Sequence, residues 1–110
     1  MNAQHKTLAA GRWGQLSFLE QMANVGSEVE RALNWKAKND PQYSMKAFER
    51  ALELLDLTLD YCQEKFHFKE IARTREVLVD FFMGSNEYAT SEKFLRSYFF
   101  QFAYAARKHK

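Results

Sequence analysis

The clearest helical pattern of the chain lies in residues 40–62, DPQYSMKAFERALELLDLTLDYC. Asp40 followed by Pro41 is typical of a helix start, because aspartate accepts hydrogen bonds from free backbone amides and proline is tolerated in the first turn. Apolar residues then recur three or four positions apart, at Met45, Phe48, Leu52, Leu55, Leu59 and Cys62. This spacing predicts a long helix with one face in the core, ending between Gln63 and Phe66.

Upstream of this stretch, a similar pattern predicts a first helix from about Ser17 to Asn39. Ser17 and Glu20 have the spacing of a capping box, in which the serine oxygen accepts from a backbone N–H and the glutamate reaches back to the cap. The expected inward residues are Leu19, Met22, Gly26, Val29 and Leu33. We expect residues 1–16 to form a flexible lead-in to a single helical domain at residues 17–110.

Two further helices are predicted downstream. The third runs from about residue 68 to residue 83 and ends at Gly84, which we expect to adopt the left-handed conformation. The last begins after a cap at Thr90 or Ser91, and its expected inward residues are Phe94 or Leu95, Tyr98, Phe102 and Ala106, with Phe99 added if the inward line starts at Leu95. No segment alternates in the manner of a strand. The sequence therefore predicts an all-α fold, an antiparallel up-and-down four-helix bundle.

Length, charge and cysteine content narrow the class of protein. The chain has 110 residues, a formal net charge of +2 and a single cysteine. This length suits one domain, and the nearly balanced charge disfavours a dedicated binder of duplex DNA. Because one cysteine forms no intramolecular disulfide and no run of about 20 apolar residues is present, we expect a cytoplasmic protein without membrane association.

The motifs for catalysis or metal binding are incomplete. Glu64 and His67 form an E-x-x-H pair, but a di-metal bundle site needs a second such pair, and neither His5 nor His109 has a glutamate three residues before it. We expect this pair to lie in an exposed turn. Cys62 continues an apolar helix face, so we expect an inert, buried thiol. The sequence predicts no catalytic residue, no metal and no cofactor, and it favours a protein that is not an enzyme.

Arg75 interrupts the apolar face of the third predicted helix. A buried guanidinium needs a carboxylate to offset its desolvation. The candidate carboxylates are Glu28, Glu53 and Asp56. One interpretation is a buried ion pair that holds two helices in register; the other is a polar pocket, which in a weaker hypothesis serves an enzyme. The residues expected around such a pocket are Arg73, Arg75, Asp80, Asn86 and Tyr88.

The last predicted helix carries more aromatic rings than one inward face can hold. Phe100 and Tyr104, four residues apart, are expected to form an outward ridge. Because exposed rings invite association, we predict a homo-oligomer, first of all a dimer, that buries them between chains, with Trp35 or Trp13 as a neighbour. In the other interpretation, the ridge binds a different protein.

An alternative function is binding of RNA or of single-stranded nucleic acid. In this interpretation Phe100, Tyr104 or Trp13 stacks on bases. The cations expected to contact phosphates are Arg96, Arg107, Lys108 and Lys110. Nucleic acid is the less favoured partner, because the overall charge is nearly balanced.

Three segments, GSEVERALNWK, AFERALELLDLTLD and RTREVLVDFF, resemble segments of a family of short, all-helical bacterial and archaeal proteins without an assigned activity. The resemblance covers most of the chain after Gly11. It implies a helical fold and supplies no catalytic residues, cofactor or substrate.

Overall fold

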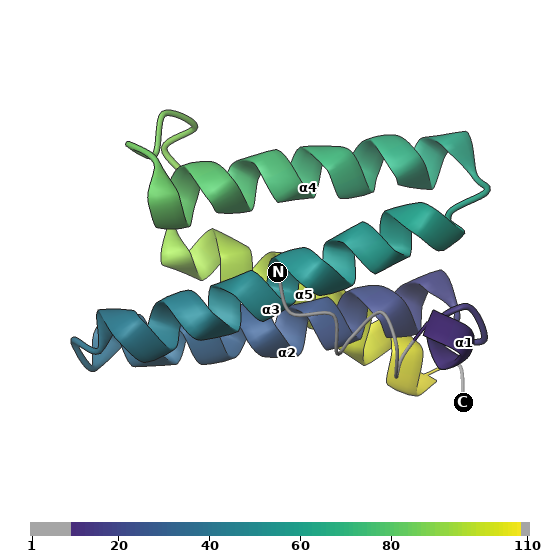
Figure 1. The fold of residues 1–110 in the computed structure, drawn as a ribbon, viewed down its shortest axis with the longest axis horizontal. Coiled ribbons are helices and arrows are strands. Elements are labelled where there is room, and N and C mark those ends of the chain that lie inside the picture. Colours follow the sequence, from purple (N-terminus) through teal and green to yellow (C-terminus); the bar gives the residue numbers. More distant parts are fainter. Residues whose placement is uncertain (1–9, 109–110) are drawn as a thin grey trace.

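The computed structural model describes residues 10–108. The helices in this range are α1 (Ala10–Trp13), α2 (Phe18–Ala37), α3 (Pro41–Tyr61), α4 (Lys65–Met83) and α5 (Glu92–Lys108). Figure 1 shows that the four long helices follow one another in alternating directions. The predicted all-helical fold is confirmed, because residues 10–108 contain no strand. None of the helices in this range is long and apolar enough to cross a membrane.

The starts of α2 and α3 follow the predicted caps. Ser17 Oγ accepts a hydrogen bond from the Glu20 amide at 3.1 Å, and the Glu20 carboxylate accepts one from the Ser17 amide at 2.9 Å. The Asp40 carboxylate accepts from the Tyr43 amide at 3.1 Å, and Pro41 is the first residue of α3. Both helices therefore begin where local side-chain chemistry satisfies their free amides.

The connection between α3 and α4 differs from the prediction. α3 ends at Tyr61 and α4 begins at Lys65, so α3 is shorter and α4 longer than the sequence pattern indicates. His67, expected in an exposed turn, lies in the first turn of α4, and its ring stacks on that of Phe18 at a centroid distance of 3.9 Å. This ring contact ties the start of α4 to the start of α2, which periodicity within one segment does not reveal.

The buried core begins before residue 17, within the range expected to be a lead-in. Trp13 in α1 is only 5% exposed, and its indole N–H donates to Thr58 Oγ1 on α3 at 3.1 Å. Its backbone oxygen accepts from the Gln21 side chain at 2.8 Å. A single tryptophan outside any periodic pattern gives no helical signal, although burial of so large a ring contributes strongly to stability. Residues 1–9 lie outside the described range.

α2 occupies the middle of the molecule, packed along α3 on one side and α5 on the other, while α3 also packs against α4. The contact between α2 and α5 is close because Gly26 faces Phe99. A Cβ atom on Gly26 would lie 2.7 Å from the Phe99 Cβ, nearer than two such atoms approach. α4 and α5, in contrast, do not pack closely against each other.

The end of α4 is capped differently from the prediction. Gly84 is not left-handed: its φ is −101°, and its amide donates to the backbone oxygens of Asp80 and Val79. The left-handed residues of the following loop are Asn86, with a φ of 56°, and Ala89, with a φ of 51°. The chain therefore reverses two to five residues after the glycine, where side chains rather than glycine stabilise the turn.

Candidate functional site

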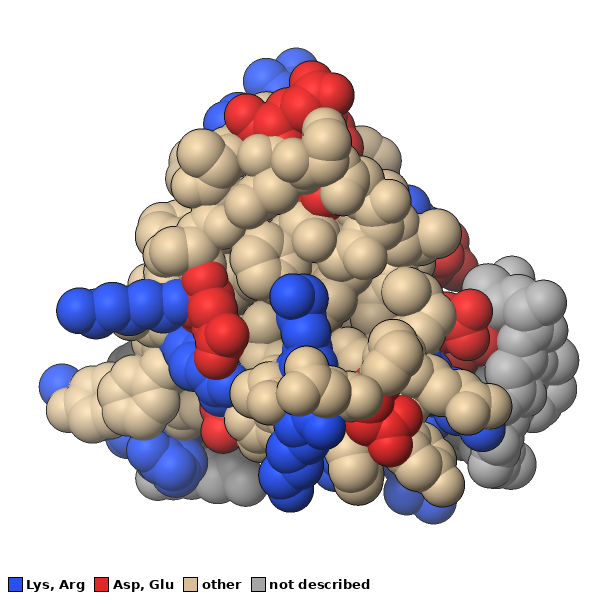
Figure 2. All heavy atoms as spheres, turned by 90° about the vertical axis from the view of Figure 1, so that its left-hand side faces the viewer, with Lys and Arg blue, Asp and Glu red and all other residues tan. Residues whose placement is uncertain are grey.

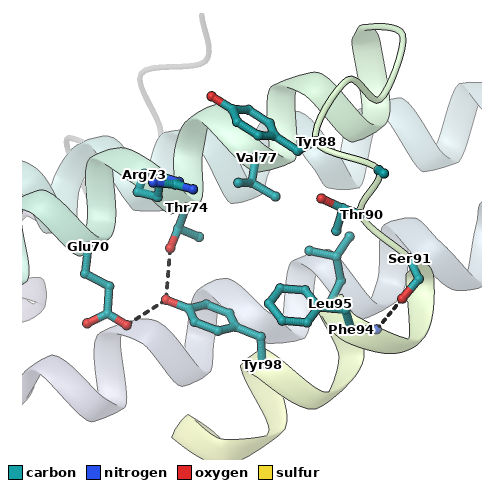
Figure 3. A pocket seen from close by; sticks show the side chains of 11 residues that line it. Glu70, Arg73, Thr74, Val77, Tyr88, Thr90, Ser91, Phe94, Leu95 and Tyr98 are labelled. Atoms are coloured by element: carbon teal, nitrogen blue, oxygen red, sulfur yellow. Dashed lines mark hydrogen bonds between the residues drawn. The ribbon is translucent and has the colours of Figure 1, made fainter.

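A pocket of about 630 Å³ lies between α4 and α5 and is closed at one end by the loop that joins them (Figure 3). We call it the α4–α5 pocket. Its lining residues are Glu70, Arg73, Thr74, Val77, Tyr88, Ala89, Thr90, Ser91, Phe94, Leu95 and Tyr98. Its volume is within the range of about 300–1,000 Å³ that is usual for pockets that hold small molecules.

One end of the α4–α5 pocket is polar. The Tyr98 hydroxyl donates to Glu70 Oε2 at 2.8 Å, and its oxygen lies 2.9 Å from Thr74 Oγ1. Since the only hydroxyl proton of Tyr98 goes to Glu70, the Thr74 hydroxyl is the donor in the second hydrogen bond. Burial, aided by the nearby Glu70 carboxylate, raises the pKa of the Tyr98 phenol above its usual value of 10.0. Tyr98 is therefore neutral at physiological pH.

Arg73 and Tyr88 form one wall of the pocket. The Arg73 guanidinium lies over the Tyr88 ring, 5.6 Å from its centroid, in a cation–π contact. The Tyr88 hydroxyl donates to Glu76 Oε2 at 3.3 Å, which holds the ring from its far end. Within residues 10–108, Arg73 takes part in no ion pair.

The loop that closes the pocket is held by two side chains. The Asp80 carboxylate accepts hydrogen bonds from the backbone amides of Glu87 at 2.8 Å and Tyr88 at 3.0 Å. The Asn86 side chain accepts from the Thr90 amide and donates to the Thr90 backbone oxygen, both at 2.9 Å. These contacts fix the position of Tyr88 and of the pocket rim relative to α4.

The polar residues predicted near Arg75 lie on different sides of α4. Arg75 Nε donates to Asp56 Oδ1 on α3 at 2.9 Å, so the predicted carboxylate partner is present. The Arg75 and Asp56 side chains are 37% and 35% exposed, and the predicted burial of this pair is wrong. Glu53 is buried on α3. Arg75, Asp80 and Tyr88 border a second hollow, whereas only Arg73 and Tyr88 of the predicted set line the α4–α5 pocket.

Sequence reasoning missed Glu70, Thr74 and the polar role of Tyr98. Glu70 and Thr74 are one helical turn apart on α4, and Tyr98 lies on another helix, 24 residues after Thr74. The turn spacing of the first two residues was the only available signal, and it did not indicate which residue would face them.

The opposite side of α5 carries an aromatic ridge, Phe100 and Tyr104. Phe100 is 61% exposed and Tyr104 is 53% exposed, and their rings are stacked with centroids 6.4 Å apart. Both are thus outward-facing in the single chain, as the sequence predicts. Their burial by a second chain stays a prediction.

A shallow groove between α2 and α5 runs beside the aromatic ridge. It consists of two adjoining hollows of about 340 and 320 Å³, which we call together the α2–α5 groove. Both hollows are bordered by Ala23, Ser27 and Ala103. Glu30 borders the first hollow and Arg107 the second. Arg31 also borders the first hollow and Glu20 the second. The groove therefore has a floor of small residues and one acidic and one basic side chain at each end.

The predicted tryptophan neighbours of the ridge lie elsewhere in the structure. Trp13 is in the core. Trp35 is partly buried at the end of α2, with its ring 4.9 Å from that of Tyr43 and the Lys38 ammonium 5.2 Å from its centroid. Neither borders the α2–α5 groove. Trp13 is also too deeply buried to stack on a base.

Two of the predicted phosphate-binding cations are exposed near the end of α5. Arg107 and Lys108 are exposed, whereas Arg96 donates to Glu92 Oε1 at 2.8 Å and to Asn34 Oδ1 at 3.0 Å. Lys110 lies outside the described range. On the face drawn in Figure 2, basic and acidic side chains are interspersed. That face lies at the opposite end of the molecule from the end of α5 (Figure 1), and it does not have the extended positive surface expected for phosphate binding.

In the part of the chain that the structure describes, no group of three or more His, Cys, Asp or Glu side chains is arranged to hold a metal ion. Comparison of the chain with protein-family models, with curated proteins and with solved structures finds no match. The resemblance to short helical bacterial and archaeal proteins therefore stays a prediction.

Proposed function

We propose that the protein is a non-enzymatic interaction module, an antiparallel four-helix bundle that associates with a second copy of itself through the outer face of α5. The observation that carries the proposal is the aromatic ridge: two stacked rings, 61% and 53% exposed, beside a groove lined with small residues. Apolar area of this kind left in water favours association.

The ridge and the groove suit a twofold dimer because they lie on the same face. Phe100 borders the α2–α5 groove and also belongs to the ridge. In a twofold arrangement the ridge of each copy covers the groove of the other, so one patch supplies both complementary shapes. Ala23, Ser27 and Ala103 in the groove floor allow rings to approach the backbone closely.

Two of the four charged side chains at the groove ends already have partners within the chain. Arg31 forms an ion pair with Glu28 at 2.9 Å, and the Glu20 carboxylate accepts a hydrogen bond from the Ser17 amide. Glu30 and Arg107 are the charges that we assign to contacts with a second copy. A twofold axis through the middle of the groove brings Glu30 of one copy near Arg107 of the second copy, and this pair occurs twice per dimer. Opposite charges at an interface rim contribute more to orientation and association rate than to affinity. The apolar contact is small, so we expect a dissociation constant on the order of 10 µM.

Sedimentation of a double variant tests this proposal. Phe100→Ser with Tyr104→Ser removes both ridge rings and should shift the dimer to monomer at about 100 µM, roughly tenfold above the expected dissociation constant. The matched control is Phe66→Ser with Phe68→Ser, which removes two exposed rings from α4 and should leave association unchanged. Circular dichroism should show the same helicity in both variants. Wild-type protein that stays monomeric, or equal loss of association in both variants, would reject the proposal.

A charge exchange tests the orientation of the two copies. Glu30→Arg or Arg107→Glu alone places like charges at both groove ends of the proposed dimer and should weaken association severalfold. The combined variant restores opposite charges and should recover wild-type affinity. Failure of the combined variant to recover would place the two copies in a different orientation.

Binding of single-stranded RNA is the second candidate function, favoured by the position of Arg107 and Lys108 on the same helix as the stacked rings. Fluorescence anisotropy with labelled oligouridine should then show binding that weakens steeply with salt and falls in Arg107→Gln with Lys108→Gln. No binding at low salt would eliminate this candidate. Binding that survives removal of the ridge rings would reject base stacking.

We also propose a cytoplasmic location. Cys62 is the only cysteine in the sequence and is partly buried at the end of α3, where its thiol lies 3.2 Å from the backbone oxygen of Glu64. A protein without a disulfide partner for its cysteine suits a reducing compartment.

A further inference from the structure

We infer that the α4–α5 pocket binds a small organic monoanion with an apolar or aromatic body, such as an aryl-alkyl carboxylate. The inference does not depend on the proposed self-association, because the pocket lies on the α4 side of α5 and the ridge does not border it. Three features carry it: an apolar surface of suitable size, an unpaired cation in the wall, and a rim held open by defined contacts.

The apolar body of the ligand has a defined place. Val77 on α4 and Leu95 on α5 face the pocket from opposite sides (Figure 3). Phe94 also borders the pocket, is 56% exposed, and has its ring stacked with that of Tyr98 at 6.2 Å. A flat or aliphatic group in the pocket would cover the Phe94 ring and remove apolar surface from water.

The anionic group of the ligand is assigned to Arg73. The Arg73 guanidinium lies over the Tyr88 ring at 5.6 Å, and this cation–π contact does not use its N–H donors. A guanidinium with available N–H groups can bind a carboxylate in two parallel hydrogen bonds. In residues 10–108 no carboxylate forms an ion pair with Arg73. The charge in the pocket wall is therefore available to a ligand.

Glu70 at the polar end limits the ligand to a single negative charge. One of its oxygens accepts the Tyr98 hydroxyl proton, and the carboxylate borders the same pocket as Arg73. A second anionic group would meet this carboxylate at close range, whereas a neutral donor such as a hydroxyl would be accepted. The pocket should therefore prefer a monocarboxylate to a dianion such as a phosphate monoester.

The pocket rim is held in place before any ligand binds. Asp80 and Asn86 hold the loop through its backbone, and Ala89 at the rim has a φ of 51°, a left-handed conformation that is unfavourable for a residue with a Cβ atom. Strained backbone of this kind is frequent at ligand sites. Because the rim is fixed, binding does not have to order it, which favours affinity.

Calorimetric titration with two matched probes tests the inference. Wild-type protein should bind 4-phenylbutyrate with a dissociation constant on the order of 0.1 mM and the neutral 4-phenylbutan-1-ol roughly tenfold more weakly. In Arg73→Gln the two probes should bind equally weakly, because the charge that separates them is gone. Lys69→Gln is the matched control: it removes an exposed cation one turn earlier on α4 that does not border the pocket, and the preference for the carboxylate should persist.

Two further variants locate the binding site. Val77→Phe places a larger side chain in the pocket and should abolish binding of 4-phenylbutyrate while circular dichroism shows unchanged helicity. Phe100→Ser with Tyr104→Ser should bind the probe as the wild-type protein does. No binding to wild-type protein, equal binding of the two probes, retained preference in Arg73→Gln or retained binding in Val77→Phe would each overturn the inference, and loss of binding in the ridge variant would move the site to the ridge.

Discussion

The two sides of α5 differ in how closely they meet their neighbours. Toward α2, Gly26 lets the helices approach until no space for a Cβ remains against Phe99. Toward α4, side chains of ordinary size and the polar group formed by Tyr98, Thr74 and Glu70 leave a pocket of about 630 Å³. Because Gly26 has no side chain, α5 packs closely against α2. Between α5 and α4, polar groups that must stay hydrogen-bonded keep the helices apart.

The largest expected effect distinguishes Phe99 from Phe94. Phe99 is buried against α2, so Phe99→Ala should lower the free energy of unfolding by about 3–5 kcal/mol through lost burial and the cavity left behind. Phe94 borders the open pocket and is 56% exposed, so Phe94→Ala should cost less than about 1 kcal/mol. Urea denaturation measures both values. Similar losses would mean that the two sides of α5 are equally well packed.

Gly26→Ala tests the close contact itself. The added methyl group meets Phe99 Cβ at 2.7 Å, and we expect a loss of about 1–3 kcal/mol in the free energy of unfolding, in spite of the better helix propensity of alanine. Gly11→Ala in α1 is the matched control, because no atom lies within 4 Å of the added carbon. It should leave stability unchanged or slightly raised. A neutral Gly26→Ala would contradict the close packing of α2 and α5.

Tyr98→Phe tests the polar side of α5. Loss of the hydroxyl removes the hydrogen bonds to Glu70 and Thr74 and should cost about 1 kcal/mol at neutral pH. Because the pKa of Tyr98 is raised in the folded protein, its contribution is present below pH 10 and is lost as the pH rises above 10. Stability measured from pH 8 to pH 11 should fall more steeply for wild-type protein than for Tyr98→Phe. Parallel curves would contradict the burial of the phenol.

The two arginine variants of α4, Arg75→Ala and Arg73→Ala, should have the smallest effects. The sequence suggests a buried pair whose loss would cost about 3–5 kcal/mol, but Arg75 and Asp56 are about one-third exposed, which reduces the expected loss to about 1 kcal/mol or less. Arg73→Ala, which breaks no ion pair in the described chain, should be close to neutral. Thermal denaturation of the two variants at low and high salt measures the difference, and a loss above about 3 kcal/mol for Arg75→Ala would restore the buried-pair interpretation.

Local chemistry made much of the fold predictable. Ser17 with Glu20 and Asp40 with Pro41 act within a few residues, and both caps are present as predicted. The outward direction of Phe100 also follows from helical spacing alone. In each of these cases the residues that determine the local structure are close together in the sequence.

Features that depend on distant residues were not predictable in the same way. Trp13 is held in the core by Thr58, 45 residues later, and Tyr98 meets Glu70 28 residues before it. The exposure of Arg75 depends on how far α4 stands from the other helices, which no pattern within α4 indicates. The α4–α5 pocket was therefore only partly anticipated, through Arg73 and Tyr88.

Chemical cross-linking at Ser27 tests the proposed twofold dimer most directly. Ser27 is exposed and borders both hollows of the α2–α5 groove, so the proposed axis passes close to it. In a Cys62→Ser background, Ser27→Cys treated with a short bismaleimide should give a covalent dimer in high yield. Ser85→Cys, exposed on the loop after α4 and outside the groove, should stay monomeric. Equal yields for the two variants, or no dimer from Ser27→Cys at about 100 µM, well above the expected dissociation constant, would contradict the pairing of ridge and groove.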